Sequence, residues 1–575
     1  MNERRALWLV VLAALAVRLV LLVARGDYIV YDEGYYLLLA RSLVAGHGFA
    51  LNGLPHVALS PLQPVLVALL SLTGLPDLWA SRLLAAVCGS LLVLPVAALG
   101  RRVGGGRLAL VAAALTAATP ALMSFVPFFP GESWNLYFGS EPLFLVLAFG
   151  AVASAARACE ARWPWWVLTG ALAGGAYLTR AEGAVLGAAL FAALAGVLAV
   201  RRAGVPDWKR LALAAAAAVV VTAPYLGYLR ATLGRWALSG RVQAAAVADA
   251  ELPSAVQGAR AGGQVLEGFV WQGEPDAFLR SLYGLDASGE WMASQYWGVH
   301  RNAVAAPAPS AAGIASPPAA GVPSPRVDSA RATAPPARRG AALVWWRGLT
   351  TVVPWWLGAL ALAGIVVGSA RALAWVLPLA ACALLPSLLT YVEPRSLLPL
   401  AVLAAIYGGA AVLWITDRVP AGWRKRARPA LVAATALVLV EPAARDLVRA
   451  WPQTTALQQV ATARRVVGEY LARHLPPDSV VMSWHPAVAL WASRPWRVLP
   501  YASFERTVRY ARAQRASAIV FSRFEPSPIP QPPRAFTIVL PGEGAASGAS
   551  VQLQPVDETP LLFVGRLAGP ARAGP

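Results

Sequence analysis

Two adjacent carboxylates stand out as residues that could do chemistry. Asp32 and Glu33 follow the first apolar run of this 575-residue chain, and Tyr36 comes shortly after them. A held carboxylate can accept a proton from a hydroxyl group and act as a general base. Two more acids, Glu132 and Glu141, are expected on the same side of the membrane. Acids that leave a membrane can also simply be solvated, and the residues alone leave both interpretations open.

Three arginines stand at the ends of apolar runs on the side of these acids, namely Arg82, Arg180 and Arg395. A guanidinium in such a place can bind an anion such as phosphate, or it can anchor the chain to lipid headgroups. Arg18 lies inside the first apolar run. Because a charge facing lipid is costly, we expect Arg18 to face the other helices.

The composition explains what must position these groups. The chain is 58% hydrophobic and 14% charged, with a mean hydropathy of +0.55, whereas soluble proteins carry about 25% charged residues. The net charge of +20 could indicate nucleic acid, but the basic residues lie in short loops between apolar runs. The three cysteines lie in or beside apolar runs, which argues against a disulfide framework. The chain is therefore predicted to be a polytopic membrane protein that begins with an uncleaved signal anchor.

Apolar runs of suitable length predict about eleven spans. They cover 7–25, 81–100, 108–126, 141–157, 164–180, 183–200, 211–229, 350–369, 372–390, 397–416 and 429–447. Basic residues gather in alternate short loops, and acids gather in the others. The positive-inside rule then predicts a cytoplasmic N-terminus and an inner (plasma) membrane location. The shorter run 61–75 indicates an interfacial or re-entrant helix, with a twelfth span as the alternative.

The predicted fold is mainly α. Residues 1–450 are expected to form a helix bundle, with the acidic pair in an external loop, 26–80, of helical character. An Ala-, Pro-, Ser- and Gly-rich stretch at 302–340 predicts a disordered external linker. Alternating helix-like and strand-like runs in 451–575 predict a small external α/β domain.

Several short motifs, in this order and on this side of the membrane, resemble the GT-C membrane glycosyltransferases, in the group of the protein O-mannosyltransferases and lipid A aminoarabinose transferases. The similar stretches are Asp32-Glu33-Gly-Tyr-Tyr36, Ala40-Arg41-Ser-Leu-Val-Ala-Gly46-His-Gly48-Phe49, Pro61-Leu-Gln-Pro64, Ala80-Ser-Arg82-Leu-Leu, Ser140-Glu141-Pro142-Leu143, Tyr177-Leu-Thr-Arg180-Ala-Glu182-Gly183, Glu393-Pro-Arg395-Ser-Leu-Leu-Pro399 and Leu471-Ala-Arg-His-Leu-Pro476-Pro-Asp-Ser-Val-Val481. The resemblance covers nearly the whole chain except 240–345.

The resemblance implies a transferase that moves a sugar from a polyprenyl-phosphate carrier to an acceptor hydroxyl on the outer face, with inversion. It implies that Asp32 is the general base beside Glu33, and that Arg395, Arg180 or Arg82 binds the donor phosphate. The acceptor, or a divalent metal if one is used, would be oriented by further residues, namely Glu141, Glu132 and Tyr36. No dedicated metal-ligand motif is present. The aminoarabinose transferases have Lys-Pro-Pro where this chain has Ser60-Pro61-Leu62, so the same donor sugar does not follow.

Two other classes stay open at this point: a polytopic lipid or sugar transporter or flippase, and a non-catalytic assembly protein. Transporters tend to carry ionisable groups near mid-membrane and related halves. Apart from Arg18 the spans are nearly free of charge, and no repeat is visible. The sequence names neither the sugar nor the acceptor, which could be a protein, a lipid or a glycan.

Overall fold

The computed structural model describes residues 2–240 and 346–567, with internal gaps of which 127–134, 368–372, 390–393, 451–455, 500–507, 523–535, 541–550 and 556–561 are the longest. Glu132 and the predicted linker 302–340 lie outside the described residues. The chain folds into two compact units. The first unit comprises Met1–Gly26, Ser60–Leu238 and Arg339–Gln453, and the second comprises Asp27–Leu59, Ser239–Arg338 and Thr454–Pro575.

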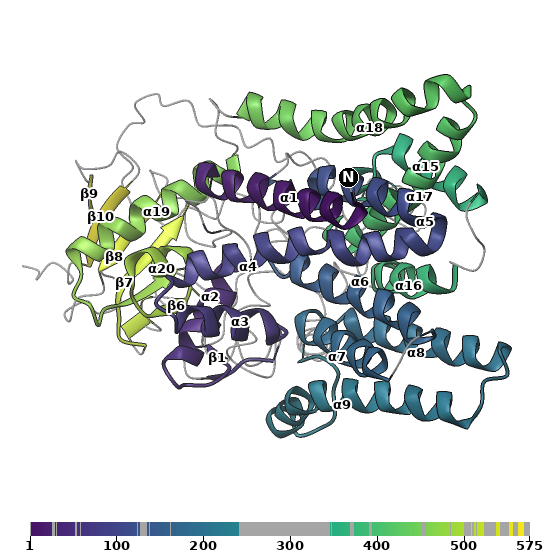
Figure 1. The fold of residues 1–575 in the computed structure, drawn as a ribbon. Helices are drawn as coiled ribbons and strands as arrows, with labels where there is room; N and C mark the ends of the chain where they lie inside the picture. Colours follow the sequence, from purple (N-terminus) through teal and green to yellow (C-terminus); the bar gives the residue numbers. More distant parts are fainter. Residues whose placement is uncertain are drawn as a thin grey trace, which may run out of the picture. The chain divides into compact units, whose positions relative to one another are not determined.

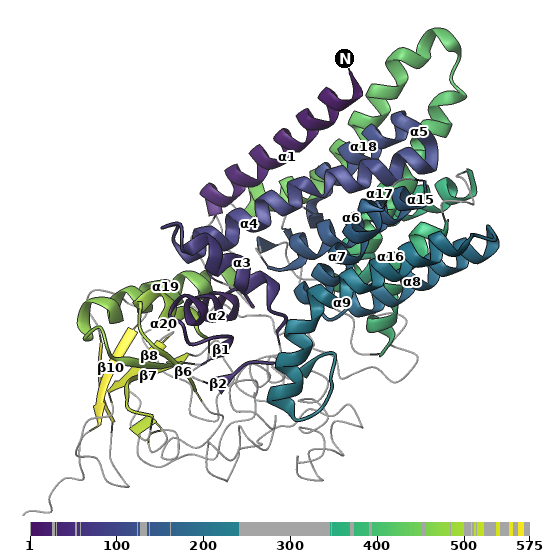
Figure 2. The ribbon, with the colours of Figure 1, turned by 60° about the horizontal axis from the view of Figure 1, so that its bottom comes forward.

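The first unit is a bundle of helices (Figures 1 and 2). Six helical stretches among the described residues are long and apolar enough to cross a membrane. The helices are α1 (Glu3–Arg25), α3 (Leu62–Ser71), α4 (Asp77–Leu91), α5 (Val93–Ala118), α6 (Glu141–Ala158), α7 (Pro164–Thr179), α8 (Gly183–Val200), α9 (Val205–Leu233), α15 (Trp355–Val367), α16 (Leu373–Leu389), α17 (Leu398–Asp417) and α18 (Ala421–Ala450). The predicted mainly helical membrane fold is confirmed, whereas the count of eleven spans stays a prediction.

Local sequence explains where several of these helices end. Helix α5 contains a break at Gly104 and Gly105, where Gly105 takes a φ of 79°, and this break lies in the predicted basic loop. The helix ends at Ala118, well before the predicted end at 126. Thr119 is extended because the proline that follows it disfavours a helical conformation. The interfacial segment forms α3, which at 10 residues is about 15 Å long and too short to cross a bilayer alone.

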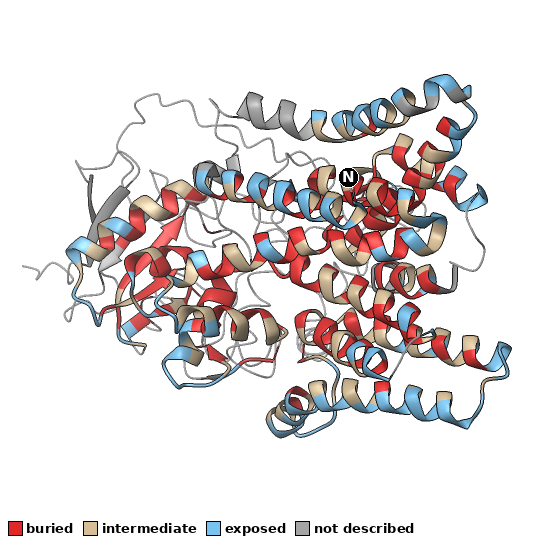
Figure 3. Ribbon diagram, in the orientation of Figure 1, coloured by how far each residue is buried: buried red, intermediate tan, exposed pale blue. Residues whose placement is uncertain are grey.

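Small residues let the helices of the bundle approach closely, as is common in membrane proteins. Helix α7 packs against both α6 and α9, and α15 packs against α17. A Cβ atom on Gly170 would lie 1.9 Å from the Ala214 carbonyl oxygen, and one on Gly364 would lie 1.8 Å from that of Tyr407. The buried residues therefore concentrate where these helices meet (Figure 3).

The second unit combines helices with a six-stranded sheet in the order β6-β5-β7-β8-β10-β9. Strands β6, β5 and β7 are parallel, β8 is antiparallel to β7 and parallel to β10, and β9 is antiparallel to β10. The elements are α2 (Glu33–Val44), the hairpin β1 (Ala50–Leu51) and β2 (Leu54–Pro55), α19 (Ala456–His474), β5 (Val480–Ser483), α20 (Ala487–Ala492), β6 (Trp496–Val498), β7 (Ala516–Ser522), β8 (Phe536–Leu540), β9 (Val551–Pro555) and β10 (Leu562–Leu567). The acidic pair therefore groups with the C-terminal residues.

Candidate active site

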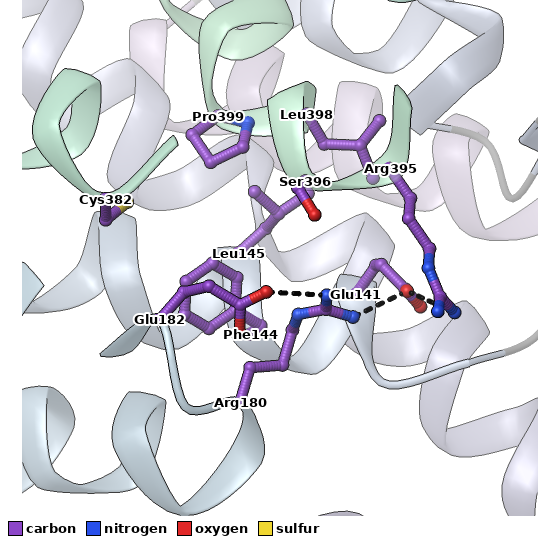
Figure 4. Close-up of a pocket in the computed structure, with 10 residues that line it drawn as sticks. All are labelled: Glu141, Phe144, Leu145, Arg180, Glu182, Cys382, Arg395, Ser396, Leu398 and Pro399. Carbon is purple, nitrogen blue, oxygen red and sulfur yellow. Dashed lines mark hydrogen bonds and ion pairs between the residues drawn. The ribbon is translucent and has the colours of Figure 1, made fainter. Parts of the chain in front are cut away.

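A pocket in the first unit lies where four chain segments end or begin (Figure 4). Glu141 is the first residue of α6, and Arg180 is the residue that ends α7. Glu182 directly precedes α8, and Arg395 lies in a short 3-10 turn, η4 (Pro394–Leu397), before α17. Because α6, α7 and α8 follow one another through short connections, their ends bring Glu141, Arg180 and Glu182 together, and the turn before α17 adds Arg395.

Two arginines converge on one carboxylate in this pocket (Figure 4). An Nη1 atom of Arg180 lies 2.8 Å from Glu141 Oε1, and Nη1 of Arg395 lies 3.6 Å from the same oxygen. The other terminal nitrogen of Arg180 donates to Glu182 Oε1 at 2.9 Å. The side chains of Arg395 and Glu141 are only 3% and 4% exposed, so the pairs are largely shielded from water and salt.

The second oxygen of Glu141 differs from the first. Its Oε2 atom is buried and makes no hydrogen bond within the described part of the chain. A buried acceptor without a partner costs free energy, so a hydroxyl group of a ligand that donates to Oε2 would bind favourably. The rest of the pocket wall is mostly apolar and comprises Phe144, Leu145, Cys382, Ser396, Leu398 and Pro399. Such a wall strengthens the electrostatic interactions inside it.

The acidic pair lies in the second unit at the start of α2. Asp32 is 3% and Glu33 is 1% exposed, so neither is a solvated surface acid. Tyr36 is also buried. The neighbouring Tyr35 contacts His485 and Trp496 edge-on, with ring centroids 6.3 and 5.7 Å apart. The start of α2 is therefore packed against residues of the C-terminal sheet.

The other predicted residues fall into separate places. Arg82 is buried in α4 of the first unit but does not line the pocket of Figure 4. Arg18 is 2% exposed, and its terminal nitrogens donate to the carbonyl oxygens of Ala14 at 3.0 Å and Leu122 at 2.6 Å. The prediction that Arg18 faces the bundle is confirmed. No group of three or more possible metal ligands is found among the described residues.

Glu182, which binds Arg180, is a further residue of the site that was not predicted from the sequence. Its position two residues after Arg180, in the same connection between helices, is the sequence feature that could have predicted this role. Ser396 and Cys382 also line the pocket and had no signal of their own.

Comparison with known proteins shows which family and which folds the chain is similar to. Residues 60–228 match the family described as dolichyl-phosphate-mannose-protein mannosyltransferase. The structure is similar to an oligosaccharyltransferase from Archaeoglobus fulgidus, with a TM-score of 0.50 and 15% identity over 90% of this chain and 69% of that one. The chain has the GT-C fold of membrane glycosyltransferases. The predicted multi-pass membrane fold is thereby confirmed, and the family match over residues 60–228 agrees with the predicted glycosyltransferase class.

Two other solved structures are similar at a lower score. ArnT from Cupriavidus metallidurans bound to undecaprenyl phosphate has a TM-score of 0.46 and 16% identity over 89% of this chain and 92% of that one. Arabinofuranosyltransferase AftD from Mycobacteria has a TM-score of 0.44 and 16% identity over 91% of this GT-C chain and 35% of that one. No curated protein matches the sequence.

Proposed function

We propose that this GT-C protein transfers a sugar from a polyprenyl-phosphate donor to an acceptor hydroxyl on the outer face of the membrane. The observation that carries the proposal is the convergence of Arg180 and Arg395 on one buried carboxylate at the ends of apolar helices. The family that matches residues 60–228 is named for a dolichyl-phosphate sugar donor. A lipid-linked phosphate is the anion class that a pocket at the ends of membrane helices would take.

The arginines suit the chemistry of the leaving group. Phosphate is a weak base, so its departure needs charge stabilisation rather than a general acid. Guanidinium groups present planar pairs of N–H donors that match phosphate oxygens. Arg180 and Arg395 supply these donors in a pocket with an apolar wall. Arg82, buried in α4, is a third cation proposed to contact the donor phosphate.

The acids suit the other half of the reaction. The acceptor oxygen forms a bond to the anomeric carbon while the bond from that carbon to the phosphate oxygen breaks, which inverts the configuration. The acceptor proton passes to Asp32, and polyprenyl phosphate leaves. Glu33 supports Asp32, and the acceptor is oriented by Glu141, Glu132 and Tyr36. The buried Oε2 of Glu141 is a suitable acceptor for such a hydroxyl.

The charge distribution supports the outer face as the side of transfer. The short loops rich in basic residues are predicted to lie on the opposite side of the membrane from the acidic pair and the pocket. The positive-inside rule assigns such loops to the cytoplasm. We therefore place the N-terminus in the cytoplasm and the second unit outside. Lipid-linked sugars that have been flipped across the membrane would supply the donor there.

The test uses the purified full-length protein in nanodiscs, radiolabelled polyprenyl-phosphate sugars and a membrane extract as acceptor. We expect Asp32→Asn to lower transfer by about 10²-fold or more, as for loss of a general base. Arg395→Gln should raise the donor KM. The matched control is Arg102→Gln, because Arg102 pairs with Glu160 at 2.7 Å but Glu160 is 57% exposed.

The outcomes separate the alternatives. Transfer retained by both Asp32→Asn and Glu33→Gln would remove the catalytic assignment of the pair. Movement of the lipid-linked sugar across vesicles without any transfer would favour a flippase.

A further inference from the structure

The first turn of α2 meets a turn of the C-terminal sheet at Gly34, the residue directly after the acidic pair. A Cβ atom on Gly34 would lie 2.9 Å from Pro486 Cγ and 3.5 Å from His485 Cε1. The first distance is shorter than real Cβ contacts allow. Only glycine therefore lets α2 lie this close to the proline, although the two residues are 452 positions apart in the chain.

The turn that touches Gly34, residues 485–487, is fixed by hydrogen bonds. The Ser483 hydroxyl donates to the His485 carbonyl oxygen at 2.9 Å, and the Ala487 amide donates to His485 Nδ1 at 3.1 Å. The Trp496 indole N–H donates to the Ser483 carbonyl oxygen at 3.0 Å. Because Nδ1 accepts a hydrogen bond, the neutral ring of His485 carries its proton on Nε2.

Aromatic packing makes a second contact between the same two segments. Tyr35 is 1% exposed and meets the rings of both His485 and Trp496 edge-on. Edge-to-face geometry is the favoured arrangement for such rings. The contact at Gly34 and the contact at Tyr35 together restrain both the position and the rotation of the first turn of α2.

The place of this turn in the sheet is also informative. It follows the carboxyl end of β5, which lies between the parallel strands β6 and β7. In the sheet, β5 and β7 are neighbours. The strand after β5 in the chain, β6, pairs with the far edge of β5, and the strand after β7, β8, pairs with the far edge of β7. In α/β sheets, functional groups concentrate at the carboxyl ends of strands where the connections diverge in this way.

We propose that the 485–487 turn is a positioning element for the acidic pair. His485 and Pro486 hold the first turn of α2 so that the carboxylates of Asp32 and Glu33 keep one orientation during transfer. The inference rests on the proposed function of the pair. The C-terminal domain thereby takes part in the reaction through α2, and His485 does not contact the substrate.

A suppression experiment tests the contact and its role in full-length protein. Gly34→Ala introduces the clash, Pro486→Ala removes the Cγ atom, and the double variant relieves the clash. We expect Gly34→Ala to lower kcat about tenfold with the donor KM within twofold, because orientation affects the chemical step and not donor binding. Pro486→Ala loosens the same contact and should lower kcat about threefold, and the double variant should recover from the tenfold loss to that level because the clash is gone. Gly187→Ala, where no atom lies within 4 Å of the added Cβ, is the control.

Two further variants separate the ring from its hydrogen bond. His485→Phe keeps an aromatic side chain but loses Nδ1, so it should lower kcat several-fold. His485→Asn, which can still accept from the Ala487 amide, should recover part of that loss. His474→Phe is the matched control, since His474 is exposed at the end of α19.

The inference is overturned if Gly34→Ala is fully active, if Pro486→Ala fails to suppress it, or if His485→Phe leaves kcat unchanged. Melting temperatures distinguish a failure of the proposed function from a failure of this inference. If the wild type transfers no lipid-linked sugar, the proposed function fails, while a drop in melting temperature in Gly34→Ala that Pro486→Ala restores would still support the contact. If the wild type is active and the Gly34 and Pro486 variants change only the melting temperature and not kcat, the positioning role is overturned.

Discussion

Replacing Glu141 by glutamine probes the pocket most directly. The substitution conserves shape and leaves an oxygen to accept from Arg180, but it removes one negative charge. The pocket holds two arginines and two glutamates that pair with one another, so Glu141→Gln leaves an excess of one positive charge. The protein should lose stability and gain affinity for a phosphate.

The structure sets the magnitudes. The Glu141 oxygen lies 2.8 Å from one guanidinium nitrogen and 3.6 Å from another, and breaking a buried pair costs about 3–5 kcal/mol. We expect about 3 kcal/mol, the lower end, because the amide oxygen keeps one hydrogen bond. The control Glu160→Gln breaks a pair in which the glutamate is 57% exposed, and it should cost about 0–1 kcal/mol.

Whereas the substitution lowers the stability of the protein, it should raise its affinity for a phosphate. A carboxylate beside the arginines repels an arriving phosphate, and a unit charge roughly 5 Å away contributes about 3 kcal/mol at an effective dielectric constant of about 20. Rearrangement and residual water offset part of this energy. We therefore expect binding to tighten about tenfold in Glu141→Gln, which corresponds to about 1.4 kcal/mol.

The assay is thermal unfolding in nanodiscs, followed by tryptophan fluorescence, with and without polyprenyl phosphate. Ligand at about 100 times its Kd stabilises the native state by about 2.7 kcal/mol. Polyprenyl phosphate should raise the melting temperature of Glu141→Gln more than that of the wild type, and polyprenyl alcohol should raise neither. Equal shifts in the two proteins would refute the reasoning, since they would place the phosphate away from Glu141.

Two further predictions follow from buried groups elsewhere. Gly89→Ala places a Cβ atom 2.8 Å from Arg18 Nε and should cost about 1–3 kcal/mol in thermal unfolding, whereas Gly187→Ala should be neutral or slightly stabilising; equal melting temperatures for the two variants would contradict the tight packing. Burial lowers the pKa of His56 to about 3, and its Nε2 accepts from the Leu59 amide at 3.0 Å, so the neutral ring is required. This stability is complete above the ordinary pKa of about 6.5 and is lost as the pH falls, by about 2 kcal/mol at about pH 5. A His56→Gln variant should show a smaller drop in melting temperature between about pH 7.5 and 5, and an unchanged drop would count against this account.

Several helices could be predicted from the sequence because a span of lipid requires an apolar run of fixed length. The predicted span 183–200 coincides with α8, since Glu182 and Arg201 mark its two ends. The early end of α5 was not predicted, because the apolar run continues past Ala118 whereas Pro120 ends the helix. Apolar content predicts burial in lipid, while the helix end depends on local backbone sterics.

Side-chain partnerships were beyond the sequence because they depend on how helices pack. Arg82, Arg180 and Arg395 shared one residue type and one predicted side of the membrane, yet only the last two line the pocket. One of the two partners of Arg180, Glu141, lies 39 positions before it, and no local pattern connects these two residues. Likewise Gly34 gave no sign that α2 packs against a turn more than 400 positions later.

The helix dipoles indicate which arginine of the pocket a phosphate would help most. Glu141 starts α6 and Arg180 ends α7, so both charges have the sign that the dipole at their helix end favours. Arg395 instead lies just before the N-terminus of α17, where the dipole disfavours a cation, and its distance to Glu141 is the longer one. Arg180 is bonded to two carboxylates, which hold it in place whether or not an anion is bound. An arriving phosphate therefore relieves more electrostatic strain at Arg395. We expect Arg395→Gln to weaken polyprenyl phosphate binding more than tenfold and to lower the melting temperature less than Arg180→Gln does; a stronger loss of binding in Arg180→Gln would contradict this assignment.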